Sequence, residues 1–289
     1  MKHLFCFGLG YTARVLSQRL AAQDWHISGT STSVQGVEGI TSSGYRGYLF
    51  DGRRATADVD SALNDATHIV LSVPPNTGGD PALACFAEAL AGSAALGWIG
   101  YLSTVGVYGN AGGGWVDEAT PAKPSSERGQ RRLLAETQWT EFGGRTGKPV
   151  AIFRLPGIYG PGRSALDDVR GGTARRIIKP GQVFNRIHVA DIANAIEAAI
   201  SKPSVTGVFN VTDDEPGPPQ DVVSYAAELL GLPPPPDLDF AKADLSAMAR
   251  SFYSESKRVK NTRLKNELGV QLQYPSYREG LKSILATGG

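Results

Sequence analysis

The stretch LFCFGLGYTA, residues 4–13, decides the fold of this chain. The apolar residues at the start of this stretch are typical of a buried strand, and the residues after it have a helical pattern. Between strand and helix, Gly8, Gly10 and Ala13 form the motif GxGxxA. In such a unit the first glycine permits a sharp turn, the second lets a pyrophosphate approach the backbone, and the alanine permits close packing. The helix N-terminus then offers N–H groups to phosphate. The stretch therefore predicts a dinucleotide site with contacts from Gly8, Leu9, Gly10, Tyr11, Thr12 and Ala13.

The alternation of strand and helix continues over the first two thirds of the chain. Further expected strands are WHISGTSTS (25–33), GYLFDGR (47–53), THIVLSVPP (67–75), WIGYLSTVGVYG (98–109), KPVAIFRLPGIYGPG (148–162) and GVFNVTDD (207–214). Apolar strands separated by helices indicate a parallel sheet that is covered on both faces. The sequence predicts an α/β fold, a Rossmann-type doubly wound parallel sheet.

The composition of the chain changes after residue 214. EPGPPQ (215–220) and PPPP (233–236) are turns or stiff connectors, and short helical patterns surround them. We expect a Rossmann core over 1–165, continued by 186–214, and a smaller C-terminal substrate lobe formed by 166–185 and 215–289. Within the core, RIHVADIANAIEAAI (186–200) is an expected helix with Asp191 as its N-cap.

Bulk composition excludes several classes of protein. The 29 basic and 28 acidic residues are spread along 289 positions, which argues against a nucleic-acid partner. No apolar run reaches the roughly 18 residues of a membrane span. Only two cysteines occur, which fits a reduced cytoplasm, and the four scattered histidines with no HExxH or CxxC predict no metal site.

The residues after the second expected strand bear on the choice between NAD and NADP. The acidic residue that usually binds the ribose 2′-hydroxyl of NAD is missing, and hydroxyl residues that include Ser31 and Thr32 replace it. A carboxylate would repel a 2′-phosphate, whereas hydroxyls donate hydrogen bonds to one, and Arg53 and Arg54 follow the next strand. NADP is therefore favoured over NAD, with a plain polar loop as the alternative.

Further blocks occur in a fixed order along the chain: GLGYTA, Asp51 after the third strand, STVGVYG followed by Glu118 and Pro121, RLPGIYGPG, IHVADIANAI, and NTRLKNELG…YPSYREGL. This order resembles the extended short-chain dehydrogenase/reductase superfamily, NAD-dependent epimerase/dehydratase type, over nearly the whole chain. The resemblance implies an NAD(P) cofactor with Asp51 at the adenine amine, and we add Val73, after the fourth strand, as a cofactor contact. Relatives of this kind commonly form homodimers through the fourth and fifth helices.

In that superfamily a Ser or Thr, a Tyr and a Lys carry the chemistry, and this chain departs from the pattern. Thr104 matches the first position, but the YxxxK pair falls on Arg128 and Arg132, in a register fixed by Glu136. Arginine stays protonated in proteins and cannot exchange a proton as the tyrosine does. Arg132 would still donate to a ribose hydroxyl. Tyr108 is either a packing residue of the VYG turn or a replacement for the missing proton donor. In this respect the chain resembles the atypical YeeZ-like subgroup of the superfamily, whose members lack the Tyr–Lys pair, here called the dyad.

Arg128 has two interpretations. In the first, Glu127–Arg131 and Arg132–Glu136 form i,i+4 ion pairs on a solvated helix face, and Arg128 meets only water. In the second, Arg128 holds a substrate carboxylate or phosphate, because a guanidinium fork suits both groups.

The carboxyl ends of the later strands supply further candidates, since the ligand cleft of an open α/β sheet lies there. Tyr159 follows one such strand, either as a packing residue of a turn or as a substrate contact. Arg163, Arg186 and Arg258 would line the cleft for an anionic substrate, and we interpret His188 as structural.

Three functions are compatible with these residues. The first is an epimerase/dehydratase-type enzyme with an unidentified small anionic or nucleotide-sugar-like substrate and a non-standard mechanism. The second is a catalytically inactive, dinucleotide-responsive regulatory protein. The third is a plain nucleotide or nucleotide-sugar binder that uses the same cleft.

Overall fold

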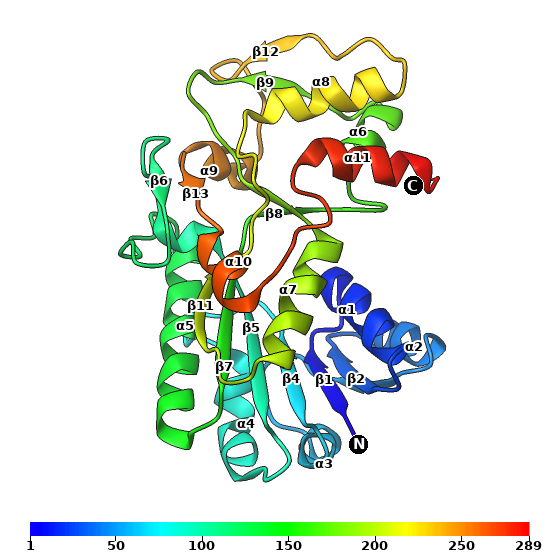
Figure 1. Ribbon diagram of the computed structural model, residues 1–289, viewed down its shortest axis with the longest axis vertical. Helices are drawn as coiled ribbons and strands as arrows, with labels where there is room; N and C mark the ends of the chain where they lie inside the picture. The colour runs from blue at the N-terminus through cyan, green and yellow to red at the C-terminus, as the bar shows by residue number, and fades with distance from the viewer. Residues whose placement is uncertain (289) are drawn as a thin grey trace.

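The computed structural model describes residues 1–288 and contains a seven-stranded parallel sheet (Figure 1). The strand order is β11-β7-β5-β4-β1-β2-β3, so the direction of winding reverses between β1 and β4. The strands are β1 (His3–Phe7), β2 (His26–Ser31), β3 (Arg46–Leu49), β4 (His68–Leu71), β5 (Trp98–Thr104), β7 (Val150–Leu155) and β11 (Gly207–Asn210). The predicted doubly wound α/β fold is confirmed.

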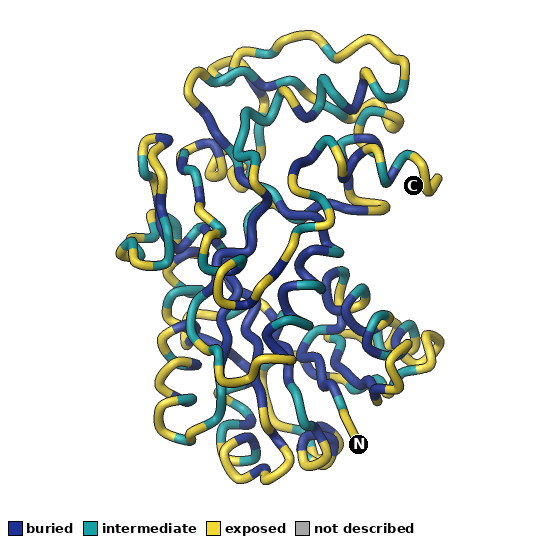
Figure 2. The backbone as a smooth tube through the Cα atoms, viewed as in Figure 1, coloured by how far each residue is buried: buried dark blue, intermediate teal, exposed yellow. Residues whose placement is uncertain are grey.

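Helices cover both faces of this sheet. One face carries α1 (Tyr11–Ala21), α2 (Val34–Ser42), α7 (Val189–Ser201) and α10 (Thr262–Leu268), and the other carries α3 (Ala57–Asn64), α4 (Pro81–Gly92) and α5 (Glu127–Thr146). Side chains alternate along a strand, so Leu4 and Cys6 of β1 join the first core while Phe5 and Phe7 join the second. Figure 2 shows the sheet buried between these helices.

A second group of elements lies beyond the carboxyl ends of the strands, at the top of Figure 1. It comprises α6 (Ala165–Arg170), β9 (Arg176–Ile178), α8 (Pro219–Leu229), β12 (Asp237–Asp239), α9 (Ala247–Tyr253) and α11 (Tyr277–Ala286). Leu166, Val222, Tyr277 and Leu281 form its main core. Although α10 falls in the range expected for this lobe, it packs against α7 and β11 instead.

Short elements complete the fold. The parallel pairs are β8 (Gly157–Tyr159) with β10 (Arg186–His188), β9 with β12, and β6 (Trp115–Val116) with β13 (Arg258–Val259). The expected strand 98–109 ends at Thr104, because a 3-10 turn, η1 (Val105–Tyr108), begins there. Among residues 1–288, no helix has the length and apolar character needed to cross a membrane.

The predicted N-cap of α7 is wrong. His188 caps the helix, since its Nδ1 accepts the Ala190 N–H at 3.1 Å. Asp191 lies within the first turn, buried, and its carboxylate accepts the N–H groups of Gln273 at 2.7 Å and Tyr274 at 3.0 Å. The carboxylate therefore fastens the segment before α11 to the core rather than capping its own helix.

Candidate functional site

The turn after β1 has the geometry that a dinucleotide phosphate requires. Gly8 has a φ of +82°, which glycine adopts without strain, and a Cβ there would lie 3.3 Å from Val73 Cγ1. Gly10 is the N-cap of α1, and a Cβ on it would meet no atom within 4 Å. No side chain caps α1 in the described part of the chain, so the N–H groups of its first turn have no capping side chain. These residues fit a bound pyrophosphate.

Tyr11 connects this turn to the loop after β8. Its hydroxyl donates to the Pro161 carbonyl at 3.1 Å, and the Arg163 guanidinium lies 5.7 Å from its ring centroid. Leu9, Thr12 and Ala13 are buried and pack beneath the turn. The structure thus brings two predicted site residues, Tyr11 and Arg163, into contact although they are far apart in sequence.

The residues expected at the adenosine end lie at the carboxyl ends of β2 and β3. Ser31 Oγ accepts the Ser33 N–H at 3.4 Å, which leaves the Ser31 hydroxyl hydrogen for a ligand. Thr32 is exposed. Asp51 accepts the Arg53 N–H at 3.0 Å and lies 3.9 Å from the Arg53 guanidinium. Asp51 therefore offsets part of the positive charge that Arg53 would offer to a 2′-phosphate.

Arg132 does not pair with Glu136, so that prediction is wrong. The Arg132 guanidinium donates to the Leu102 carbonyl at 2.8 Å and to the Tyr101 hydroxyl at 3.1 Å, at the carboxyl end of β5. Glu136 is buried and instead forms a salt bridge with Arg154 of β7 at 2.6 Å. The buried guanidinium of Arg154 needs a carboxylate more than the half-exposed Arg132 does. In contrast, the predicted Glu127–Arg131 pair is present.

Thr104 and Tyr108, the two catalytic candidates, occupy different environments. Thr104 Oγ1 accepts the Gly106 N–H at 3.1 Å and caps η1, and the residue lines a pocket between the two groups of elements. Tyr108 is buried, its hydroxyl donates to Asn210 Oδ1 at 2.8 Å, and the Arg154 guanidinium lies 4.7 Å from its ring centroid. Desolvation raises the pKa of Tyr108. In this geometry Tyr108 does not line the pocket, while Thr104 does.

The pocket beside Thr104, here called the interlobe pocket, has a volume of about 600 Å³. It gathers four predicted residues, Thr104, Arg128, Arg163 and Arg186. Side chains of α9 form much of the opposite wall. Arg128 lies 5.9 Å from the ring centroid of Phe252 and forms no salt bridge within residues 1–288. Arg128 is therefore an exposed cation on the lining of this pocket, and its role as a contact for a substrate anion stays a prediction.

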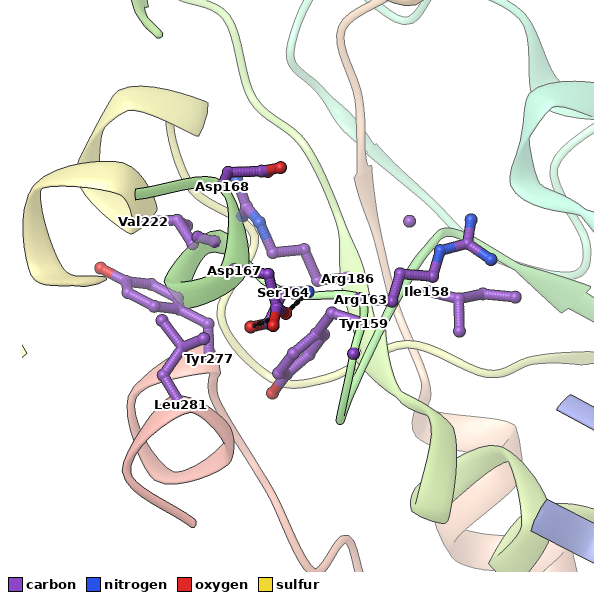
Figure 3. Close-up of a pocket in the computed structure, with 13 residues that line it drawn as sticks. Ile158, Tyr159, Arg163, Ser164, Asp167, Asp168, Arg186, Val222, Tyr277 and Leu281 are labelled. Atoms are coloured by element: carbon purple, nitrogen blue, oxygen red, sulfur yellow. Dashed lines mark hydrogen bonds between the residues drawn. The ribbon is translucent and has the colours of Figure 1, made fainter. Parts of the chain in front are cut away.

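A second pocket of about 460 Å³, here called the lobe pocket, lies among α6, α8 and α11 and is also lined by Arg163 and Arg186 (Figure 3). Tyr159 lines the lobe pocket, but its hydroxyl donates to the Ser276 carbonyl at 3.2 Å. A Cβ on Gly280 would lie 2.1 Å from the Tyr159 hydroxyl oxygen. Tyr159, at the end of β8, thus packs against α11. Figure 3 shows Arg163 pointing away from Ser164 and Asp167, on the side of Ile158.

Arg186 lies between these two pockets, and an unusual carboxyl accompanies it. Its guanidinium donates to the carbonyls of Phe184 at 3.2 Å and Gly217 at 3.4 Å, and burial lowers its pKa. Burial raises the pKa of nearby Asp213 to about 8, in spite of the opposing effect of Arg186. Asp213 Oδ2 has no hydrogen-bond partner in the described residues. At neutral pH Asp213 is mostly protonated, and Arg186 keeps a net positive charge.

Two other predicted residues lie outside both pockets. Arg258 donates to the Gly113 carbonyl, beside β6, and so does not line the cleft as expected. His188 caps α7, and burial lowers its pKa to about 4, so it is neutral, in line with its structural interpretation.

Sequence reasoning missed several residues that line the interlobe pocket. Met248 and Phe252 lie four apart on α9, and Glu255 and Lys257 form a salt bridge of 2.6 Å in the following segment. The i,i+4 apolar pair was the only local signal, and a short amphipathic helix normally buries such a pair. Asp213 gave no signal, because it follows β11 like an ordinary loop carboxylate.

Comparison with known proteins places the chain in a family. No protein-family model matches it. Protein YeeZ from Escherichia coli K12 is 32% identical over 290 residues, which span 95% of this chain and 97% of YeeZ. The solved structure of a functionally unknown conserved protein from Silicibacter pomeroyi DSS is 51% identical over 99% of each chain, with a TM-score of 0.91.

A more distant structure shows the shared fold alone. It is dTDP-glucose 4,6-dehydratase from Bacillus anthracis Ames in complex with NAD, which is 18% identical and has a TM-score of 0.79 over 99% of this chain and 96% of the other. Together with the site geometry, the similarity to YeeZ confirms the family indicated by the sequence blocks. The chain belongs to the YeeZ-like branch of the extended short-chain dehydrogenase/reductases, within the NAD-dependent epimerase/dehydratase superfamily.

Proposed function

We propose that the chain binds a nicotinamide dinucleotide at the carboxyl end of its sheet and an anionic small molecule in the interlobe pocket. The observation that carries the proposal is the β1–α1 turn, where Gly10 leaves space for a pyrophosphate and the first turn of α1 offers unsatisfied N–H groups. The distant dehydratase structure contains NAD, which supports the same class of cofactor. NADP is favoured here over NAD, because Ser31 retains a hydroxyl hydrogen and no carboxylate ends β2.

The residues at the reactive end of this site support a non-standard mechanism. A bound cofactor would supply or accept a hydride. Thr104, at the C-terminal end of β5, would donate its hydroxyl hydrogen to a substrate oxygen, because its Oγ already accepts the Gly106 N–H. Arg128 would orient an anionic group, and Arg132 would add positive charge near the end of β5. None of these arginines exchanges a proton at neutral pH, so the substrate itself or another pocket residue would have to do so.

The test is a calorimetric titration with NADPH, NADH and ADP-ribose. We expect NADPH to bind most tightly, and Gly10→Ala to weaken NADPH by at least about tenfold, since the added methyl group fills the phosphate space. Gly144→Ala is the matched control, because a Cβ there also meets no atom within 4 Å but lies on α5. Equal affinity for all three ligands, or equal effects of the two variants, would contradict the proposal.

The second candidate function is a dinucleotide-responsive protein without catalysis. One observation favours it. The lysine position of the dyad holds Arg132, whose guanidinium already donates hydrogen bonds to the Leu102 carbonyl and the Tyr101 hydroxyl. Oxidation of bound NADPH by any carbonyl compound, followed at the nicotinamide absorbance, would exclude this alternative. Tight NADPH binding without such turnover across a carbonyl screen would support it.

A further inference from the structure

The interlobe pocket has an apolar wall that the proposed function leaves unexplained. Met248 and Phe252 of α9 line it, yet their side chains remain 65% and 51% exposed. Exposed apolar side chains that adjoin one another along a cleft form a candidate binding surface. Val105 and Ile158 extend the apolar lining, as do Phe184 and Tyr253, whose rings pack edge to face at 5.1 Å. The wall is therefore suited to a flat apolar group.

The same pocket carries positive charge that the protein does not neutralise. Arg128 and Arg163 line it, and neither forms a salt bridge in the described residues. Both instead lie over aromatic rings, Arg128 over Phe252 and Arg163 over Tyr11. Arg186 adds a third cation to the lining, and the other two charged residues, Glu255 and Lys257, pair with each other at 2.6 Å. The net charge of the lining is therefore positive, which favours an anionic ligand.

We propose that the occupant of the interlobe pocket is an aromatic carboxylic acid. Its ring would pack on Phe252 and Met248, and its carboxylate would bind Arg128 and Arg163, which stand beside the same apolar surface. A sugar or nucleotide would bury many hydroxyl groups against this wall, and unpaired polar groups are costly to bury. The inference rests on the proposed function, because it specifies the substrate class of that site, but its binding test does not require turnover.

Three matched probes separate the two parts of the ligand. trans-Cinnamate carries a ring and a carboxylate, cinnamyl alcohol carries the ring without the charge, and crotonate carries the charge without the ring. We expect cinnamate to bind at least about tenfold more tightly than either partial probe, in calorimetry with and without saturating NADPH. UDP-glucose is the fourth probe and is expected to bind more weakly than cinnamate.

Variants assign each part to its residues. Phe252→Ala should weaken cinnamate by about tenfold while leaving crotonate unchanged, because it removes only the ring contact. Arg128→Gln should weaken both acids by about tenfold or more and leave cinnamyl alcohol unchanged. Arg131→Gln is the control, since this neighbour on α5 pairs with Glu127 outside the pocket. All of these positions are at least partly exposed, so the variants should fold.

The outcomes separate this inference from the proposed function. If NADPH binds tightly but crotonate and cinnamate bind equally well, the aromatic-acid proposal is wrong and the dinucleotide site stands. The same holds if UDP-glucose binds more tightly than cinnamate. Cinnamate binding that responds to Phe252→Ala and Arg128→Gln supports the aromatic acid. If that response appears without any dinucleotide binding, the pocket assignment stands and the proposed function fails.

Discussion

Replacing Asp213 by asparagine should stabilise the protein at pH 8 and change its stability much less at pH 5. Asp213 is 2% exposed, and burial raises its pKa to about 8 from an ordinary value of 3.8. The folded state therefore holds a proton that the unfolded chain releases above pH 4. The contribution of this group is fully favourable below pH 4 and is lost progressively as the pH rises toward 8. Asparagine is neutral throughout and does not suffer this loss.

The size of the effect follows from that interval. Where the folded state binds one proton more than the unfolded state, the free energy of unfolding falls by about 1.36 kcal/mol per pH unit. The three units from pH 5 to pH 8 therefore give about 4 kcal/mol. The free energy of unfolding of the Asp213→Asn variant, relative to the parent protein, should rise by about 2 to 4 kcal/mol over this range. The attraction of Arg186 is already contained in the raised pKa, and the lower figure reflects partial ionisation of folded Asp213 as the pH approaches that pKa.

Urea unfolding at pH 5, 6, 7 and 8, followed by circular dichroism, measures this difference directly. Asp214→Asn is the matched control: Asp214 is the neighbouring carboxylate, exposed, and paired with Lys265 at 2.6 Å. Its removal should change the free energy of unfolding by less than about 1 kcal/mol at every pH. A stability difference for Asp213→Asn that stays constant from pH 5 to pH 8 would refute the reasoning, because Asp213 would then be ionised throughout.

Three further predictions concern the buried framework of the site. Glu136→Gln should lower the free energy of unfolding by about 3 to 5 kcal/mol, since Arg154 would remain buried without its carboxylate, and adding Arg154→Met should recover part of this loss in urea unfolding. Gly8→Ala should destabilise the protein by about 1 to 3 kcal/mol, because alanine is strained at a φ of +82°; an unchanged melting temperature would contradict this. Tyr108→Phe should cost about 1 kcal/mol by leaving Asn210 Oδ1 without its donor, and it should leave NADPH affinity unchanged in a titration.

The Rossmann fold was predictable because its signals are local. Each strand is a short apolar run, and the φ of +82° at Gly8 is one that favours glycine. The i,i+4 rule was correct for Glu127–Arg131, where both side chains lie on the surface. It failed for Glu136, because a buried partner on β7, 18 residues away, competes for the same carboxylate.

The wall of the interlobe pocket was not predictable, because it depends on which segments meet in space. Asp191 illustrates the difficulty: next to a helix start its carboxylate suggests a cap, but its partners are backbone groups more than 80 residues further on. Phe252 and Met248 likewise resemble ordinary core residues of a helix. Only their exposure beside Arg128 distinguishes them as candidate ligand contacts.

The interleaved path of the chain limits how this protein can exchange parts with its relatives. The elements over the sheet come from two separate stretches, since α6 and β9 precede β10 and α7, whereas α8, β12, α9 and α11 follow them. A single crossover between two genes near residue 215 would transfer the later elements and leave α6 and β9 behind. The new α8 would then pack on a foreign α6, and β12 would pair with a foreign β9. New specificities in this branch should therefore arise more readily by point substitution, as on α9, than by recombination of whole segments.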